Sequence, residues 1–123
     1  MFDIEIAGKV RTAKVTFKTA VVYEAEFHSD LTKDFFGKQV YREEDRQPED
    51  GLTIDFTATN WNVVMKVLWA ALKTADPRLP GFERWADETE GANLWYAAEV
   101  LAIECADCFF RPDSAGEDEA RGQ

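Results

Sequence analysis

The sequence predicts an α+β fold, with an N-terminal β-hairpin followed by a mainly α-helical domain. Apolar and polar residues alternate over residues 2–6, which is the period of a half-buried strand. Over 61–72 and again over 94–109, apolar residues recur at the spacing of amphipathic helices. The chain has 123 residues, enough for one hydrophobic core but not for two. We therefore expect a single domain over residues 1–110.

The first strand is predicted from Phe2, Ile4 and Ile6, which alternate with acidic residues. Ala7-Gly8-Lys9 is suited to a tight turn. From Val10 the chain returns as a second strand, which the alternation of Val15 and Phe17 extends to residue 17.

From Thr19 the period becomes helical, and Thr19 itself is placed to cap a short helix. One face of that helix carries Val22, Tyr23 and Phe27. Ser29-Asp30 indicates a break and a new N-cap. A second short helix, ended by Gly37, carries Leu31, Phe35 and Phe36.

Residues 38–51 are polar and charged, with Pro48 and Gly51 as turn residues, and we expect a mobile loop there. The next residues, 52–56, alternate again and form either a short strand or an extended lead-in that covers the core. The C-terminal residues 111–123 are rich in glycine and acids and contain no apolar residue larger than alanine. We expect this acidic tail to be disordered, because it has nothing to bury.

The longest apolar stripe belongs to a helix that begins near Trp61, capped by Asn60 or Thr59, and that ends before Pro77. Its members are Trp61, Val64, Met65, Leu68, Trp69 and Leu72. Trp69 lies mid-stripe and is predicted to anchor the core. Lys73, in the last turn, suits the negative end of the helix dipole. A short helix over 82–88 and a second long helix over 94–109 are expected to follow.

The charge of the chain limits its partners. A net charge of −10 argues against binding to nucleic acid or to an anionic membrane, since both would repel it. No apolar run approaches 18 residues and no signal-peptide pattern begins the chain, so we expect a soluble cytoplasmic protein. Two cysteines three residues apart, Cys105 and Cys108, are interpreted as small apolar core residues in a reducing compartment.

No pattern of residues indicates catalysis. Neither a nucleophile elbow, a glycine-rich phosphate loop nor a dinucleotide fingerprint occurs. His28 is the single histidine, and a zinc site would need more ligands than Cys105 and Cys108 supply. We therefore expect no catalytic residue, no cofactor, no metal and no enzymatic activity.

Two segments resemble those of the tail assembly chaperones of long-tailed, siphophage-like bacteriophages. The first is Tyr23-x-x-x-Phe27 followed by Ser29-Asp30-Leu31-x-x-Asp34-Phe35. The second is the run LWAALKTAD at 68–76, followed by Pro80-x-Phe82-Glu83-x-Trp85. The resemblance covers roughly residues 2 to 110. His28 departs from it, standing where we would expect glycine, which suggests that this turn closes differently here.

The resemblance implies a non-enzymatic chaperone that binds the tape measure protein, keeps it soluble and helps to recruit tail tube subunits. Such a protein acts in the host bacterial cytoplasm, is absent from the mature virion, and is often accompanied by a frameshifted longer form or self-associates. The apolar stripes over 61–72 and 94–109 are the expected client surfaces. Two other interpretations stay open: an acidic inhibitor that mimics DNA, and a structural head–tail or tail component. The candidate partner-binding residues are Tyr23, Phe27, Asp30, Leu31, Asp34, Trp61, Met65, Trp69, Lys73, Phe82, Trp85 and Trp95.

Overall fold

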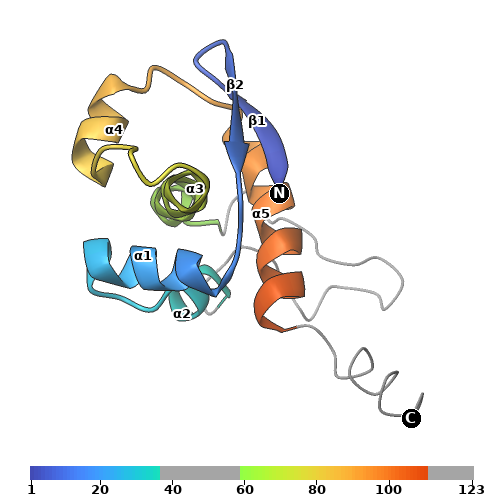
Figure 1. Cartoon of the computed structure of the whole chain (residues 1–123). Coiled ribbons are helices and arrows are strands. Elements are labelled where there is room, and N and C mark those ends of the chain that lie inside the picture. Colours follow the sequence, from blue (N-terminus) through green and yellow to red (C-terminus); the bar gives the residue numbers. More distant parts are fainter. Residues whose placement is uncertain (37–58, 111–123) are drawn as a thin grey trace.

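The computed structural model describes residues 1–36 and 59–110 (Figure 1). The predicted loop at 38–51, the alternation at 52–56 and the tail at 111–123 lie outside the described residues. Within the described ranges, two strands are followed by five helices. The predicted α+β fold, with an N-terminal hairpin and a mainly helical remainder, is confirmed.

Strands β1 (Phe2–Ile6) and β2 (Lys9–Ala13) form an antiparallel hairpin. Its two turn residues both have positive φ, 52° at Ala7 and 82° at Gly8. These are the backbone signs of a type I′ turn, whose twist matches that of the strands. The expected extension of β2 to Phe17 is wrong, since β2 ends at Ala13 and Phe17 begins the first helix.

Helix α1 (Phe17–Phe27) begins three residues earlier than the predicted cap implies, because Thr16 and not Thr19 is its N-cap. The Thr16 hydroxyl accepts a hydrogen bond from the Lys18 amide at 3.1 Å, and the Thr19 hydroxyl accepts one from the Thr16 amide at 3.0 Å. This is a capping box in which threonine takes the place of the usual glutamate. The buried Thr19 hydroxyl also lies 2.8 Å from that of Thr74, which joins the start of α1 to the end of the central helix.

His28 ends α1 and turns the chain toward α2 (Leu31–Phe36). Its φ of 56° is the left-handed conformation that glycine adopts at little cost, so the turn keeps glycine-like geometry despite the histidine. The predicted cap of the next helix is confirmed, since Asp30 Oδ1 accepts hydrogen bonds from the Thr32 hydroxyl at 2.8 Å and the Thr32 amide at 3.0 Å. These bonds, with a further one from the Lys33 amide, hold the pKa of Asp30 below its ordinary value.

Helix α3 (Trp61–Ala75) lies at the centre of the described domain, with α1 and α2 on one side, α4 on another and β2 on a third (Figure 1). Asn60 caps it as predicted, accepting hydrogen bonds from the amides of residues 62 and 63. Its buried residues are Val63, Val64, Val67, Leu68, Trp69, Ala70, Ala71 and Leu72. Trp69 is only 2% exposed, so its placement in the core is confirmed.

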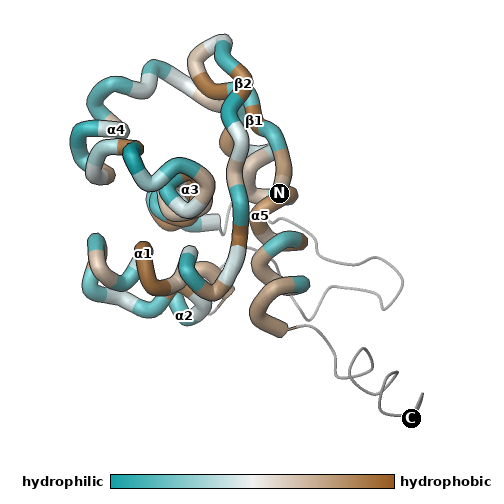
Figure 2. The backbone as a smooth tube through the Cα atoms, in the orientation of Figure 1, coloured by the Kyte–Doolittle hydropathy of each residue, from teal (hydrophilic) through white to brown (hydrophobic). Residues whose placement is uncertain are grey.

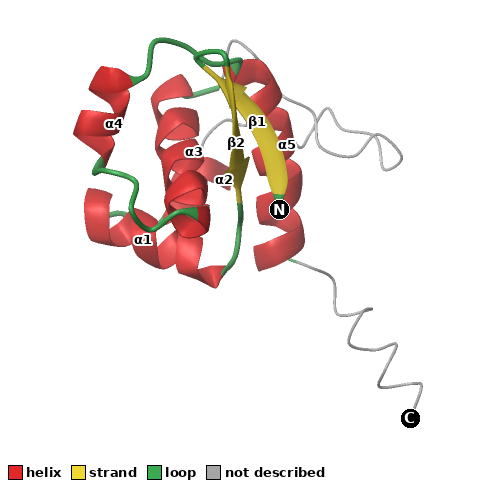
Figure 3. Ribbon diagram, turned by 45° about the horizontal axis from the view of Figure 1, so that its top comes forward, coloured by secondary structure: helices red, strands yellow, loops and turns green. Residues whose placement is uncertain are grey.

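The last two helices, α4 (Phe82–Glu88) and α5 (Leu94–Phe109), have the predicted bounds. Figure 3 shows the hairpin beside α3 and α5, and the Ala7 amide donates to the Gly91 carbonyl just before α5, at 2.7 Å. The inner face of α5 consists of Ala97, Ala98, Leu101, Ala102 and Cys105, all buried. Small residues on this face let α5 approach α3 closely.

One cluster of buried side chains draws on the hairpin and on all five helices. Hydrophilic residues dominate α4, whereas apolar residues recur along α3 and α5 (Figure 2). Over residues 1–36 and 59–110, no helix is both long enough and apolar enough to cross a membrane.

Candidate protein-binding surfaces

The two segments that carry the family resemblance meet in space. The Phe27 ring, at the end of α1, has its centroid 4.8 Å from that of Tyr23, 5.6 Å from that of Trp69 and 5.0 Å from that of Phe82. The Phe82 ring in turn lies 5.9 Å from that of Trp85. We call these five side chains the aromatic cluster. Tilted and edge-on ring pairs of this kind contribute beyond the area they bury.

A carboxylate from α1 completes α4. Gly81 is the N-cap of α4 and supplies no side-chain cap. Glu26 Oε2 takes that role from across the interface, accepting a hydrogen bond from the Phe82 amide at 2.9 Å. A Cβ at Gly81 would lie 3.3 Å from the same oxygen, so glycine permits this close approach. The first and second segments are therefore joined by polar as well as aromatic contacts.

The turn between α1 and α2 is tied by a buried phenol. The Tyr23 hydroxyl donates to Asp34 Oδ2 at 2.9 Å, and the Ser29 hydroxyl donates to the same oxygen at 2.7 Å. Burial raises the pKa of Tyr23 above its ordinary value, and the hydrogen bond to Asp34 and its charge add to this effect. Tyr23 therefore stays a neutral donor that fixes the position of α2.

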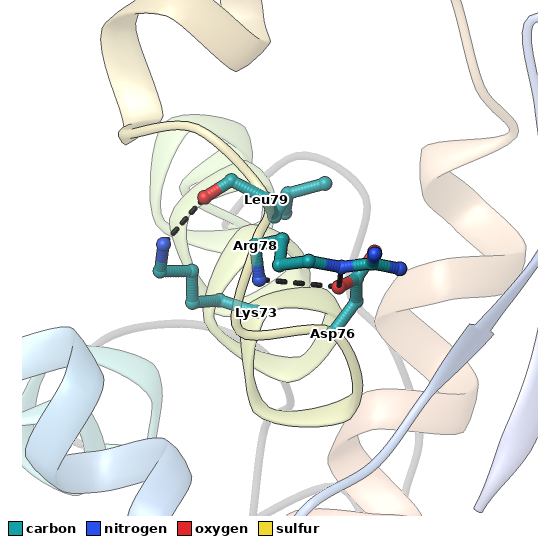
Figure 4. Close-up of polar contacts among 4 residues, drawn as sticks. All are labelled: Lys73, Asp76, Arg78 and Leu79. Atoms are coloured by element: carbon teal, nitrogen blue, oxygen red, sulfur yellow. Dashed lines mark hydrogen bonds and ion pairs between the residues drawn. The ribbon is translucent and has the colours of Figure 1, made fainter.

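The loop after α3 is held to that helix by two side chains. Trp69 Nε1 donates to the Pro80 carbonyl at 2.9 Å, and Lys73 Nζ donates to the Leu79 carbonyl (Figure 4). Asp76 accepts hydrogen bonds from the amide of Arg78 at 3.1 Å and from its side chain at 3.4 Å. The second segment is thus a helix, its turn and the start of the next helix, each linked to the others.

Most candidate partner-binding residues therefore support the fold. Tyr23, Leu31, Trp69 and Trp85 are buried. Phe27, Asp34, Trp61, Met65, Lys73 and Phe82 are half-buried, and only Asp30 and Trp95 are exposed. The expectation that the α3 stripe serves a client is wrong for its middle, because Val64, Leu68 and Trp69 face the core from the centre of the domain.

The exposed apolar surface instead follows α5. Tyr96, Ile103 and Phe110 are 44%, 59% and 56% exposed, and Val100 between them is half-buried. We call these four residues the outer seam of α5. Tyr96, Val100 and Ile103 are spaced by four and three positions, which puts them on one side of α5. Phe110 is the C-cap residue, seven positions after Ile103, and its ring packs edge-on against that of Phe36 with centroids 5.3 Å apart. The sequence analysis missed this seam because the inner stripe of the same helix, through Ala98 and Leu101, has a similar period.

Aromatic pairs flank the two ends of α5. At its start, the Trp95 ring stacks on that of Trp61 with centroids 6.2 Å apart. At its end, the Phe109 ring stacks on that of Phe17 with centroids 5.9 Å apart and planes 10° from parallel. Phe17 is 71% exposed, so this pair presents a large apolar area to solvent. These pairs extend the apolar surface from α5 onto α3 and α1.

The two cysteines of α5 form no disulfide, with Cys105 buried and Cys108 half-buried. Burial raises the pKa of Cys105 above its ordinary value, which keeps the thiol protonated and unreactive. Among the residues that the structure describes, no group of three or more histidine, cysteine and acidic side chains is placed to hold a metal ion.

Comparison of the chain with models of protein families, with curated proteins and with solved structures finds no match. Its function is therefore inferred from its own residues and their geometry.

Proposed function

We propose that this chain is a phage tail assembly chaperone that binds a helical segment of the tape measure protein and keeps it soluble. The observation that carries the proposal is the outer seam of α5, where Tyr96 and Ile103 stay exposed although the same helix has a complete core-facing side. An exposed apolar strip on a strongly acidic domain suits a protein that covers a client without precipitating.

The spacing of the seam suits a helical client. Steps of four and three along a helix produce the seam of a coiled coil, into which the apolar stripe of a second helix packs. Asp107 occupies the seam position between Ile103 and Phe110. A single polar residue at such a position favours one register over others at some cost in affinity. The proposed complex is therefore a helix laid along α5 in one register.

The family resemblance supports the rest of the proposal. Its two segments pack together through the aromatic cluster and the bond between Glu26 and Phe82, so they belong to one structural unit. On this basis we extend the proposal to recruitment of tail tube subunits, to action in the host cytoplasm and to absence from the mature virion. Self-association and a frameshifted longer form belong to the same proposal.

The test is co-expression of the chain with a tape measure protein from the same genome, scored as soluble complex. Ile103→Glu places a charge in the seam, so it should abolish soluble complex while leaving the melting temperature nearly unchanged. Val21→Glu is the matched control, because Val21 is a similarly exposed apolar residue, 56% exposed, on α1 and outside the seam. This control variant should retain the complex.

Salt separates the proposal from the rival DNA mimic. A complex held by apolar burial should survive moderate salt, whereas surface charges are screened over about 8 Å at physiological ionic strength. Parallel co-expression with nucleases gives the rival its own assay. The chaperone proposal would be contradicted if the tape measure protein stayed insoluble and a nuclease were captured in a salt-sensitive complex.

A further inference from the structure

The outer edge of β2 has backbone groups that face away from the hairpin. The pairs Ile6–Lys9, Ile4–Arg11 and Phe2–Ala13 flank a two-residue turn, so these residues exchange the ladder hydrogen bonds. Val10 and Thr12 consequently direct their amides and carbonyls outward. Neither residue makes a backbone hydrogen bond beyond the ladder to any other described residue. The edge ends at Lys14, whose amide donates to the Ala71 carbonyl of α3 at 3.1 Å.

This edge borders a cleft of about 630 Å³ between β2, the end of α3 and α4. Apolar atoms of Leu72, Leu79 and Trp85 contribute to its walls. Figure 1 shows α4 across from β2, on the side of β2 that faces away from β1. An extended chain that paired with the edge would lie at the mouth of the cleft, and its side chains on one face would point into it.

The β2 side of the cleft is basic in a chain whose net charge is −10. Lys9, Arg11 and Lys14 line it, and none of the three forms an ion pair with a described residue. Lys9 and Arg11 lie opposite Ile6 and Ile4, so they share the core-directed face of the hairpin and not its outer face.

The acids on the facing wall are already engaged. Glu88 accepts a hydrogen bond from Arg84 at 3.0 Å, and Asp76 pairs with Arg78 at 3.4 Å. The charges in this cleft that have no ion-pair partner among the described residues are therefore the positive ones on the β2 side.

We propose that β2 binds an extended acidic segment of a partner protein, which adds to the hairpin as a third strand. Its backbone pairs with Val10 and Thr12, and its acidic side chains, at alternate positions, lie beside Lys9 and Arg11. Strand addition supplies affinity through main-chain hydrogen bonds and specificity through alternate side chains. This site shares no residue with the outer seam of α5, and the inference does not depend on the proposed client.

A second copy of the chain is a poor occupant. Antiparallel pairing of two β2 edges would set Lys9 and Arg11 of one copy against the same basic residues of the other, and like charges directly opposite are destabilising. Lysine on an edge strand is also a known protection against such pairing. The same charges attract an acidic strand, which makes the edge selective.

The test titrates the full chain, labelled with ¹⁵N, with an eight-residue peptide that alternates glutamate and valine. We expect shifts and slowed hydrogen exchange at the Val10 and Thr12 amides. Replacing each glutamate of the peptide by glutamine should weaken binding about fivefold or more, since opposite-charge cross-strand pairs are lost. N-methylation at alternate residues should abolish binding, because it removes the donors of one peptide edge.

Charge variants of the protein complete the test. Arg11→Glu should weaken binding of the acidic peptide about tenfold, and Lys9→Glu gives an independent check if the first variant folds poorly. Lys18→Glu is the control, since it makes the same charge change at an exposed site on α1. Equal loss in Arg11→Glu and Lys18→Glu, equal affinity for the glutamine peptide, or shifts confined to other elements would overturn the proposal. Dimerisation through β2 in the absence of peptide would also overturn the proposal. Failure of the peptide to bind would overturn it too, and would mean that the basic residues only protect the edge from pairing.

Discussion

The helices α3 and α5 have similar lengths and similar apolar periodicity but opposite situations in the fold. Eight of the 15 residues of α3 are buried, against five of the 16 residues of α5. The difference arises from neighbours, because α3 is packed by β2 and by the four other helices, whereas α5 packs chiefly on α3. Apolar periodicity therefore identifies the faces of a helix that can be buried. The neighbouring elements determine which of these faces is buried in the fold.

The strongest test of this difference replaces one tryptophan on each helix by alanine. Trp69→Ala should lower the free energy of unfolding by about 3–5 kcal/mol, because it removes a buried ring and its hydrogen bond to the Pro80 carbonyl. Trp95→Ala should cost less than about 1.5 kcal/mol, since Trp95 is 41% exposed. Denaturant unfolding of both variants measures the contrast. Near-normal stability of Trp69→Ala would show that this indole belongs to an interface and not to the core.

A second test concerns the inner face of α5. Ala98 is fully buried, so Ala98→Leu should lower the free energy of unfolding by about 1–3 kcal/mol through overpacking against neighbouring residues. Ala86→Leu, at an exposed position of α4, is the control and should change stability by less than about 0.5 kcal/mol. If both variants are equally stable, α5 can move away from α3, and its inner face is not closely packed.

The sequence predicted the elements whose start and stop signals are local. Asn60 caps α3 with its own side chain, and the bounds of α4 and α5 follow from their periodicity. The start of α1 was placed late because Phe17 continued the alternation of the strand, while the Thr16 and Thr19 hydroxyls act as a pair. A weak local pattern was thus outweighed by a capping box that only the folded turn reveals.

The candidate site was less predictable, because it depends on contacts between distant segments. Glu26 caps a helix that begins 56 residues later, and nothing in its neighbourhood in the sequence indicates this. The outer seam of α5 was overlooked because a helix with two apolar faces has no single stripe to identify. Which of the two is exposed depends on the position of α3, and that information lies outside α5.

A smaller effect distinguishes the two cysteines of α5. Cys105→Ala should lower the free energy of unfolding by about 1 kcal/mol, because Cys105 is fully buried, and Cys108→Ala should leave it within error. In the native protein a thiol reagent should modify Cys108 first, since Cys105 is buried and burial raises the pKa of its thiol. Capture of the tape measure protein should survive both changes. Faster modification of Cys105 would indicate that the inner face of α5 opens readily.

The smallest expected effect concerns the turn between α1 and α2, the two helices that pack on one side of α3. It tests whether their packing determines the stability of α3. His28 holds a φ of 56°, which costs a residue with a Cβ about 1 kcal/mol and glycine almost nothing. Glycine loses more freedom on folding, so His28→Gly should raise the free energy of unfolding by only about 0.5 kcal/mol. His28→Ala keeps the Cβ and should give no gain.

Hydrogen exchange would locate this gain. The amides of α3 should slow about twofold in His28→Gly, because buried amides exchange mainly through global unfolding. The last turn of α5, near Phe109, should show no change if it opens locally. Slower exchange at the end of α5 as well would mean that α3 and α5 open together. The two helices would then differ in burial but not in stability.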